Sequence, residues 1–475
     1  MGAYTVEETK AYIEELVKKG KAAQEIFERD YTTQRPVDEV VQAISKAVAN
    51  NFAELALGAV GETGMGDVKG KMAKMGGIIA QWNYMRGKKS VGYLDNLESE
   101  PGVRIIAKPL GVIGCVMPST NPVITVIGNA QIALKCRNAV IIAPHPSSAS
   151  ASMKTTEYMR KALKNIGAPT DLVQCISPEY ASIEATQHLL SCCDSNIATG
   201  GTGMVKAVYS SGRPSFGVGP GNCQAIIDDE YDDMEGACKA IVENRSFDLG
   251  VPCTGEQTVH VSAAREQEFL DAMRAAGSFI IENKEDIDKF RELVFPGGST
   301  FMNRQIVGRT VQQVGEMIGI KVPDDRIGLC FKVEGKGKEE VLNKEILCSV
   351  TRYRTYDTFK DGVAAAKANL LEWEGAGHSS TLWVNDRPDR IEYAAMILPV
   401  GRFHLNQPSR GNNNGMPPTV TVACGSWGNN SICENLQYYH LMNKTHVTVS
   451  MPNKRVPKIE DLDEFGPCPF FEDKE

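Results

Sequence analysis

One cysteine near the middle of the chain follows a tight turn, and its surroundings suit a nucleophile. Cys253 comes directly after Gly250-Val251-Pro252 and shortly before a strand-like run at 258–262. A thiol held at such a turn can face a cleft with its own backbone N–H close by, as covalent catalysis requires. Most cysteines are small apolar core residues, and this chain has thirteen of them. Taken alone, Cys253 could therefore be either a nucleophile or a partly buried cysteine in a loop.

A second segment offers a partner for this thiol. Met117-Pro118-Ser119-Thr120-Asn121-Pro122 stands between an apolar strand-like run and a helical run. The side-chain amide of Asn121 could donate to an oxygen that becomes charged when a thiol attacks a carbonyl. An Asn in this place can equally cap the helix that follows, and the two roles are compatible.

The elements that carry these residues alternate between strand and helix from residue 111 to residue 221, with strands expected at 111–117, 139–143, 172–176 and 196–198. Near-continuous apolar strands separated by helices predict a parallel sheet covered on both faces. Such sheets bind nucleotides at the carboxyl ends of their strands. Two loops are expected there, Ala143-Pro144-His145-Pro146 and Thr199-Gly200-Gly201-Thr202-Gly203. The second loop could offer N–H groups to phosphate, or it is a glycine turn without a ligand, since it does not match G-x-G-x-x-G.

The rest of the chain divides into helices before this sheet and a second α/β region after it. Apolar spacing predicts helices at 7–30, 37–57 and 72–84, with Pro36 as a break. The turn-rich stretch 91–110 predicts a β-hairpin, either an arm for assembly or a plain surface hairpin. The second region is expected to hold strands at 223–228, 258–262, 381–384 and 403–406 and helices at 233–244, 264–276 and 283–293.

Composition excludes several classes of function. The formal net charge is −8, with 42% hydrophobic and 23% charged residues, which fits a soluble enzyme and not a nucleic-acid-binding protein. No apolar run has the length of a membrane span, and the N-terminus lacks the pattern of a signal peptide. The cysteines form no C-x-x-C pairs, so we expect a reducing, cytoplasmic compartment, no disulfide framework and no metal.

Longer strings of residues make a resemblance specific. The chain resembles the aldehyde dehydrogenase superfamily over nearly its full length, and more closely its CoA-acylating branch. The strings that carry this are Arg137-Asn138-Ala139 to Pro146, Tyr209 to Pro214, Gly217 to Asn222, and Cys424-Gly425-Ser426-Trp427-Gly428-Asn429-Asn430-Ser431. The resemblance implies an α/β aldehyde dehydrogenase-like fold. Its parts would be a Rossmann-type cofactor domain (1–90 and 111–220), an oligomerisation hairpin (91–110), a catalytic domain (221–440) and a C-terminal strand and tail (441–475).

The resemblance also implies a mechanism. Cys253 would attack an aldehyde, Asn121 and the backbone N–H of Cys253 would hold the oxyanion, and hydride transfer to a nicotinamide would leave a thioester. Hydrolytic members carry a Glu-Leu-Gly-Gly string whose Glu activates water, whereas Gly217-Val218-Gly219-Pro220 stands here. Coenzyme A is therefore the expected acyl acceptor. The alternatives are a hydrolytic enzyme that releases the free acid and a catalytically silent binding or structural member.

Further site residues follow from the same resemblance. Glu345 is expected to hold the nicotinamide ribose, and NAD versus NADP stays open because the usual lysine near the adenosine ribose is missing. His378, in a predicted glycine turn, would assist deprotonation of CoA or be structural. Arg410 and Asn406 would bind a carboxylate or sulfonate, or Arg410 is an exposed loop charge, so acetaldehyde, sulfoacetaldehyde and succinic semialdehyde are all candidates. Relatives imply a homodimer or homotetramer. The expected cofactor-binding residues are Ser119, Thr120, Pro144, His145, Pro146, Gly200, Gly201, Thr202, Gly217, Gly219 and Glu345.

Overall fold

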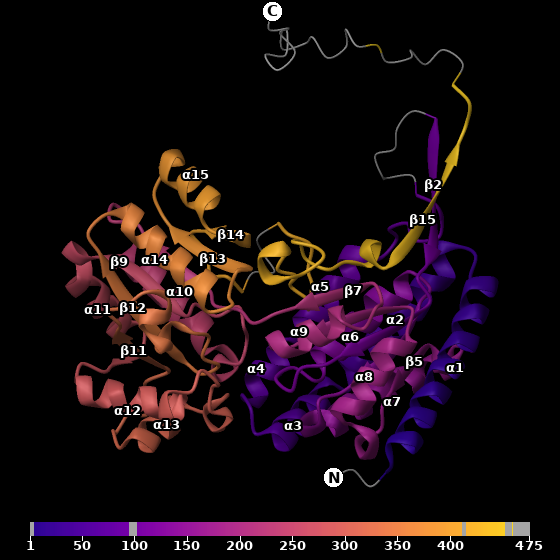
Figure 1. Cartoon of the computed structure of the whole chain (residues 1–475), viewed down its shortest axis with the longest axis horizontal. Coiled ribbons are helices and arrows are strands. Elements are labelled where there is room, and N and C mark those ends of the chain that lie inside the picture. Colours follow the sequence, from indigo (N-terminus) through magenta and orange to yellow (C-terminus); the bar gives the residue numbers. More distant parts are fainter. Residues whose placement is uncertain (1–3, 95–101, 411–414, 452–457, 459–475) are drawn as a thin grey trace, which may run out of the picture.

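The computed structural model describes residues 4–94, 102–410, 415–451 and 458, and it contains two parallel sheets side by side (Figure 1). The first has the strand order β5-β4-β3-β6-β7 and is parallel throughout. Its strands are β3 (Val112–Val116), β4 (Ala139–Ala143), β5 (Val173–Cys175), β6 (Ser195–Thr199) and β7 (Ser215–Val218). The predicted strands at 111–117, 139–143, 172–176 and 196–198 are confirmed, and β7 was not predicted.

Helices cover both faces of this first sheet because its strands are apolar on both sides. α1 (Val6–Asp30) and α8 (Ile183–Cys192) pack against one face, and α6 (Ile124–Lys135) and α7 (Ala149–Asn165) against the other. α2 (Gln34–Asn50) lies over α6 and α7, and α9 (Thr202–Tyr209) lies against β6 and β7. The predicted doubly covered α/β sheet is therefore confirmed.

Two of the predicted N-terminal helices are each divided in two. The stretch predicted as one helix at 37–57 is α2 followed by α3 (Phe52–Thr63), with Asn51 at the break. Pro36 does not break the chain, because it lies in the first turn of α2, where a proline costs no hydrogen bond. The run at 72–84 is α4 (Val68–Ala73) and α5 (Met75–Met85), separated at Lys74. Of these helices, α3 and α5 pack on the first half, whereas α4 contacts the segment Phe247–Gly250 before Cys253.

The second sheet is also parallel and has the order β10-β11-β12-β9-β8-β13-β14. Its strands are β8 (Gln224–Ile227), β9 (Thr258–Ser262), β10 (Ser278–Ile280), β11 (Gly328–Lys332), β12 (Val350–Tyr356), β13 (Gly377–Trp383) and β14 (Val400–Leu405). α10 (Met234–Ser246) and α11 (Glu266–Ala275) contact its strands on one side and α14 (Phe359–Glu372) on the other. α12 (Lys284–Val294), α13 (Val311–Ile318) and α15 (Pro388–Ile397) complete this half.

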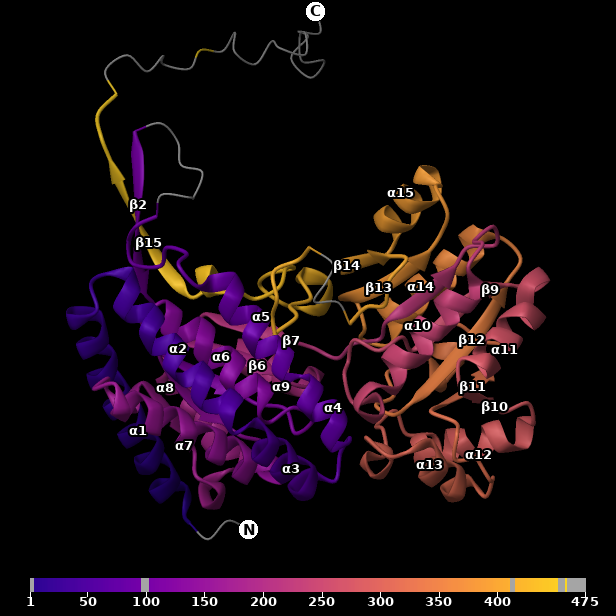
Figure 2. The same ribbon diagram turned by 180° about the vertical axis from the view of Figure 1, so that it is seen from behind.

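A small antiparallel sheet projects from the first half. β2 (Val103–Pro109) pairs with β1 (Gly92–Tyr93) and with β15 (Met442–Thr448). The predicted hairpin strands are present, although most of the predicted turn, 99–101, lies outside the described residues. Figure 2 shows this sheet from behind, standing clear of the two larger ones. No helix in the described part of the chain combines the length and apolar character that a bilayer crossing needs.

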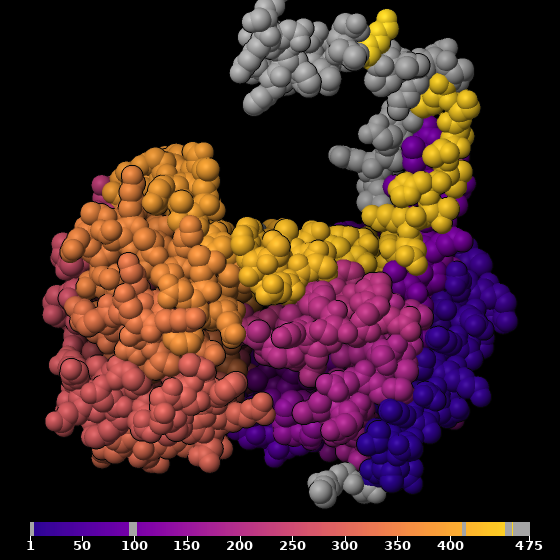
Figure 3. Space-filling model, in the orientation of Figure 1, coloured from indigo at the N-terminus to yellow at the C-terminus, as the bar shows by residue number. Residues whose placement is uncertain are grey.

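The C-terminal segment joins the two halves before it reaches β15. In Figure 3 it runs in yellow from the edge of the orange half across the top of the magenta part of the first half. Its apolar side chains complete the core of the first half, to which Leu436, Tyr438 and Leu441 belong. The sequence had instead assigned residues 421–440 to the catalytic domain. Thr421 also donates to Asn129 of α6 over 2.9 Å. The predicted division into domains stays a prediction. The C-terminal segment contacts both halves, since Cys424 lies against Gly377 of β13 and Leu436 lies in the first core.

Candidate active site

Cys253 lies in the short loop between α10 and β9, and its thiol faces a histidine. The Sγ atom of Cys253 is 3.3 Å from Nε2 of His378. The loop turns sharply because Asp248 and Leu249 both have left-handed backbone angles, with φ of 49° and 53°. These conformations are rare for residues other than glycine and mark a loop that its surroundings hold in place.

His378 is not in a glycine turn, which corrects the expectation from the sequence. It is the second residue of β13, the strand beside the edge strand β14, and its side chain is fully buried. Gly377 has a φ of +87°, and a Cβ there would lie 1.7 Å from the carbonyl oxygen of Cys424. Glycine is therefore needed for a close approach of the chain, and the strand continues through it.

A buried arginine fixes His378. Arg402 of β14 donates from Nη2 to the carbonyl oxygen of His378 over 2.7 Å and from Nε to Oγ of Ser379 over 3.2 Å. The same Ser379 hydroxyl lies 3.1 Å from Nδ1 of the His378 ring. With Nδ1 protonated and donating to Ser379, Nε2 is left as an acceptor for the proton of Cys253.

The environment keeps both groups uncharged. Burial raises the pKa of the Cys253 thiol to about 12, and the charges of Glu345 and Cys424 add to this, while Arg402 opposes it. Burial, together with the charge of Arg402, lowers the pKa of His378 well below its usual range. The pair is therefore a thiol beside a neutral imidazole, and the thiol must lose its proton at the moment of attack to become nucleophilic.

The glycine loop that follows β7 packs directly on the cysteine. A Cβ at Gly221 would lie 2.4 Å from the carbonyl oxygen of Cys253. The N–H of Gly221 donates to Oε1 of Glu345 over 3.0 Å. Burial raises the pKa of Glu345 to about 8. The segment Gly217–Gly221 itself contains no carboxylate, so Glu345 is the acidic side chain whose charge acts most on the thiol.

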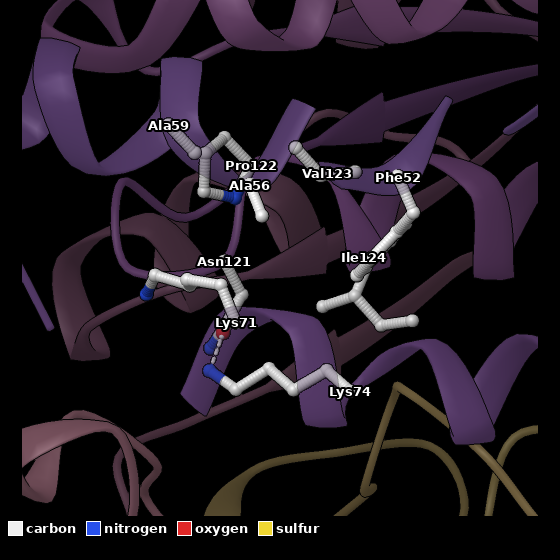
Figure 4. A pocket seen from close by; sticks show the side chains of 9 residues that line it. All are labelled: Phe52, Ala56, Ala59, Lys71, Lys74, Asn121, Pro122, Val123 and Ile124. Carbon is white, nitrogen blue, oxygen red and sulfur yellow. Dashed lines mark hydrogen bonds between the residues drawn. The ribbon is translucent and has the colours of Figure 1, made fainter. Parts of the chain in front are cut away.

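Asn121 follows β3 and meets a cluster of charges that the sequence did not reveal. Lys74 donates to Oδ1 of Asn121 and to Asp248, and Figure 4 shows the first of these bonds. Lys71 donates to Oδ2 of Asp248 and to the carbonyl oxygen of Thr120, both over 2.8 Å. Lys71 and Lys74 line a small cavity with apolar walls from α3 and the start of α6. The only sequence signal was two lysines three residues apart near an apolar helical run.

The predicted cofactor loops gather at one edge of the first sheet. Ser119 and Thr120 follow β3, Pro144, His145 and Pro146 follow β4, and Gly200 and Gly201 follow β6, with Thr202 as the first residue of α9. These are carboxyl ends of parallel strands, where such sheets bind dinucleotides. Thr202 also donates to Glu374 of the second half over 3.0 Å. Gly217 is the third residue of β7, and its N–H donates to the hydroxyl of Tyr209, whereas Gly219 directly follows the strand. That these residues bind a cofactor stays a prediction.

The two residues predicted to bind substrate lie in different surroundings. The guanidinium of Arg410 stacks on the ring of Phe247 at 3.9 Å, close to the loop that carries Cys253. The amide of Asn406 instead bonds at both ends with the backbone of Val384, over 2.8 Å each. The neighbouring amides that the sequence suggested, at 412–414, lie outside the described residues. Both substrate roles stay predictions, and Arg410 is the better placed.

The fold and this site match a known family. The family model described as "Aldehyde dehydrogenase family" matches residues 3–288. The chain belongs to the aldehyde dehydrogenase family. It is 40% identical over 457 residues to the succinate-semialdehyde dehydrogenase (acetylating) of Clostridium kluyveri, covering 95% of this chain and 98% of that protein. It is 33% identical to the sulfoacetaldehyde dehydrogenase of an Acholeplasma species, covering 94% and 92%.

A solved structure agrees with these relatives. The crystal structure of an acetylating aldehyde dehydrogenase from Geobacillus thermoglucosidasius superposes with a TM-score of 0.89 at 31% identity, covering 96% of this chain and all of that one. The resemblance to the acylating branch of the aldehyde dehydrogenase family is therefore confirmed, as is the predicted fold.

Proposed function

We propose that this aldehyde dehydrogenase oxidises a short aldehyde to its acyl-CoA, with NAD or NADP as electron acceptor and Cys253 as the nucleophile. The observation that carries the proposal is the 3.3 Å contact of Cys253 Sγ with the neutral His378 imidazole. It stands beside a glycine segment, Gly217–Gly221, that has no carboxylate to activate water. A thiol such as that of CoA is then the better acyl acceptor, because its pKa lies far below that of water.

In the first half of the reaction, His378 Nε2 accepts the proton of Cys253 as the sulfur attacks the aldehyde carbon. The carbonyl π electrons move to oxygen, which the amide of Asn121 and the backbone N–H of Cys253 hold as an oxyanion. One such donor is typically worth about 10²–10³ in rate. A nicotinamide held at this site would supply the acceptor for the hydride of the tetrahedral carbon. The oxyanion collapses to a carbonyl, and Cys253 carries a thioester.

In the second half, the thiol of CoA attacks the thioester carbon and Cys253 leaves as thiolate. His378 is again the base within reach: it returns to the neutral form after the first half and accepts the thiol proton of CoA. The same oxyanion donors serve both halves. Because every step reverses through the same groups, the enzyme also reduces acyl-CoA to aldehyde when reduced cofactor is in excess.

The residues around the cofactor edge fit a nicotinamide dinucleotide. The loop before α9 presents the backbone N–H groups of a helix N-terminus to the cleft, a suitable site for the pyrophosphate. Ser119, Thr120 and the segment 144–146 would line the nucleoside end. Gly217, Gly219 and Glu345 would meet the nicotinamide end, where Glu345 can accept from a ribose hydroxyl once it releases the N–H of Gly221.

The substrate we favour is a short aldehyde with an anionic group at its other end. Arg410 stacks on Phe247, next to the Cys253 loop, with its guanidinium 3.9 Å from the ring, and a guanidinium pairs well with a carboxylate or sulfonate. Two relatives bear the names of aldehydes of this kind, succinate semialdehyde and sulfoacetaldehyde. Acetaldehyde is the uncharged candidate that a substrate panel must include.

The deciding experiment follows reduction of NAD and of NADP with acetaldehyde, succinic semialdehyde and sulfoacetaldehyde, with and without CoA. We expect sustained turnover only with CoA, and at most one equivalent of reduced cofactor per subunit without it. Cys253→Ala should remove the activity with every aldehyde. Sustained turnover without CoA would instead identify a hydrolytic enzyme, and full activity of Cys253→Ala would remove the proposed nucleophile.

We also propose that the enzyme is a homodimer or homotetramer in the cytoplasm. The projecting sheet of β1, β2 and β15 supports assembly, since it contacts little of its own chain beyond its base (Figure 1). The described cysteines are all free thiols, as a reducing compartment favours. Light scattering of the purified protein and fractionation of the source cells test the two statements.

A further inference from the structure

A lysine ammonium lies behind the amide of Asn121. Lys74 stands between α4 and α5, and its side chain is only 12% exposed. Its Nζ donates to Oδ1 of Asn121 and to Asp248 (Figure 4). Asp248 belongs to the loop that carries Cys253, so the ammonium lies beside the loop of the proposed nucleophile. Asn121 Nδ2 makes no hydrogen bond to another described residue.

Asp248 and Lys71 hold this ammonium in place. Oδ2 of the fully buried Asp248 accepts from both lysines, and Oδ1 accepts from the N–H of Asp67 over 3.1 Å. Lys71 also donates to the carbonyl oxygen of Thr120, the residue before Asn121. The two ammonium groups thus bind adjacent residues: Lys71 binds the backbone oxygen of Thr120, and Lys74 binds the side-chain oxygen of Asn121.

The backbone around the cluster is shaped to allow it. Asp248 has a left-handed φ of 49°. A Cβ at Gly66 would lie 2.0 Å from its Oδ1, and a Cβ at Gly70 would lie 2.6 Å from its Cα. Both glycines are therefore required for the carboxylate to reach the lysines. A strained residue and two close glycine contacts in one place are typical of a site that is held for function.

We propose that Lys74 is a positioning residue of the oxyanion hole: by holding Oδ1 of Asn121 it presents Nδ2 of the same amide to the oxygen of the substrate. This inference rests on the proposed function, because it assigns a task to Asn121 within that reaction. Neither the sequence motifs nor the relatives' names point to Lys74.

The reason is that an ammonium can only donate. A side-chain amide has one accepting end and one donating end. Rotating the Asn121 amide by half a turn would place its NH₂ against the Nζ protons of Lys74, with no acceptor between them. The ammonium therefore selects one of the two orientations. It also polarises the amide, because a hydrogen bond to the oxygen strengthens donation from the nitrogen.

At neutral pH the lysine retains the charge this task needs. Burial and the neighbouring charge of Lys71 lower the pKa of Lys74 to about 8, against the opposing charges of Asp248 and Cys253. Assays near pH 7 therefore compare a charged Lys74 with its variants. The cation–ring distance from Lys74 to Phe247 is 5.8 Å, so Lys74 also lies near the ring on which Arg410 stacks. The test must accordingly separate positioning of Asn121 from direct binding of an anionic substrate.

The test is a double-mutant cycle in the full-length enzyme, measured as the rate of reduced-cofactor formation in a single turnover without CoA. The variants are Lys74→Met, Asn121→Ala and the pair, with Lys74→Arg to restore the charge. The matched control is Lys69→Met, an exposed position in α4, the helix that ends just before Lys74. Each is assayed with propionaldehyde and with succinic semialdehyde, and thermal unfolding and alkylation of Cys253 report whether the fold and thiol are intact.

We expect Lys74→Met to slow the turnover about 10- to 100-fold with both aldehydes, with the aldehyde KM changed less than about 3-fold. Adding it to Asn121→Ala should cost less than about 3-fold more, because its partner is already gone. Lys74→Arg should recover part of the loss, and Lys69→Met should match the parent enzyme.

Three outcomes would overturn the proposal. The losses of the two single variants could multiply in the pair, which would make the residues independent. The loss could be confined to succinic semialdehyde and to KM, which would make Lys74 a ligand of the substrate anion. Lys74→Met could also be as active as the parent. If the parent enzyme needs no Cys253 or turns over without CoA, it is the proposed function that fails, and the cycle still reports on Lys74 and Asn121.

Discussion

At the scale of single residues, the reactive groups of this site are held in uncharged forms. Cys253 has a pKa of about 12, and the pKa of His378 lies well below its usual range. A thiol–imidazole contact in such surroundings does not ionise by itself, because separating charge in a poorly solvated site is costly. In the proposed reaction, attack is therefore coupled to the arrival of the carbonyl, whose oxygen takes the negative charge that Asn121 and the backbone would stabilise. The same feature protects Cys253 from chance oxidation and alkylation.

Glu345 controls this reactivity in a pH-dependent way. Its pKa is raised to about 8, so it is mostly uncharged below that pH and mostly charged above it. The charged form raises the pKa of Cys253. Glu345→Gln should therefore speed alkylation of Cys253 by iodoacetamide at about pH 9 by about 3- to 10-fold, one pKa unit being tenfold. At about pH 7 the two proteins should react alike. The rate is followed by mass spectrometry of the peptide that contains Cys253.

Glu334→Gln is the control for this prediction, because its side chain is 85% exposed and far more solvated. It should leave both rates unchanged. Equal rates for Glu345→Gln and the parent at about pH 9 would show that the carboxylate does not act on the thiol.

The sequence predicted some of these residues and could not predict others. Cys253, Asn121 and Glu345 stand in recognisable strings, so their places were expected from the resemblance. Lys74 and Arg402 stand in no such string. A buried lysine or arginine is rare unless it is paired, and nothing in a linear sequence shows that Asp248 or the carbonyl of His378 will be the partner. Only the folded chain brings those groups together.

At the scale of elements, one error arose because glycine was taken as a sign of turns. The glycines before His378 predicted a turn, but Gly377 lies in a strand and is small because Cys424 approaches it closely. The spacing of apolar residues at 37–57 correctly predicted helical structure, yet it could not show that the helix breaks at Asn51. Tertiary contacts decide such cases, whereas the long amphipathic helix α1 and the apolar strands β3 and β4 follow from their own patterns.

The contact of α4 with the Cys253 loop offers a test at this scale. A Cβ at Gly70 would lie 2.6 Å from Cα of Asp248, so Gly70→Ala must push α4 away from the loop. Overpacking of this kind typically costs about 1–3 kcal/mol, to be measured as the free energy of unfolding in urea. Turnover should fall with it, because Lys74 moves with the helix.

Gly76→Ala is the matched control, since a Cβ there meets nothing within 4 Å and the residue lies in helix α5. It should be neutral or stabilising by up to about 1 kcal/mol, as alanine favours a helix over glycine. Gly70→Ala as stable and active as Gly76→Ala would mean that the close packing of α4 on the loop does not occur.

At the scale of the whole molecule, the site depends on both sheets at once. Asn121 comes from the first sheet, Cys253 and His378 come from the second, and the segment 421–441 packs into the first core after it has covered His378 from the side of Cys424. The alternation of strands and helices predicted two α/β regions, but strand order and the crossing of this segment are long-range features that periodicity cannot give. The position of Asn121 relative to Cys253 and His378 therefore depends on how the two halves are held together.

The projecting sheet carries a final prediction. Three apolar side chains on this sheet or directly after its last strand are exposed in the single chain: Tyr93 by 45%, Val449 by 62% and Met451 by 42%. Exposed apolar residues gathered on a projecting element favour burial against another copy. Replacing Tyr93 and Val449 together by Ser should lower the mass measured by light scattering at micromolar concentration. Met396→Ser, at an equally apolar position that is 78% exposed on α15, should leave the mass as it is. An unchanged mass in the double variant would exclude this sheet as the main assembly contact.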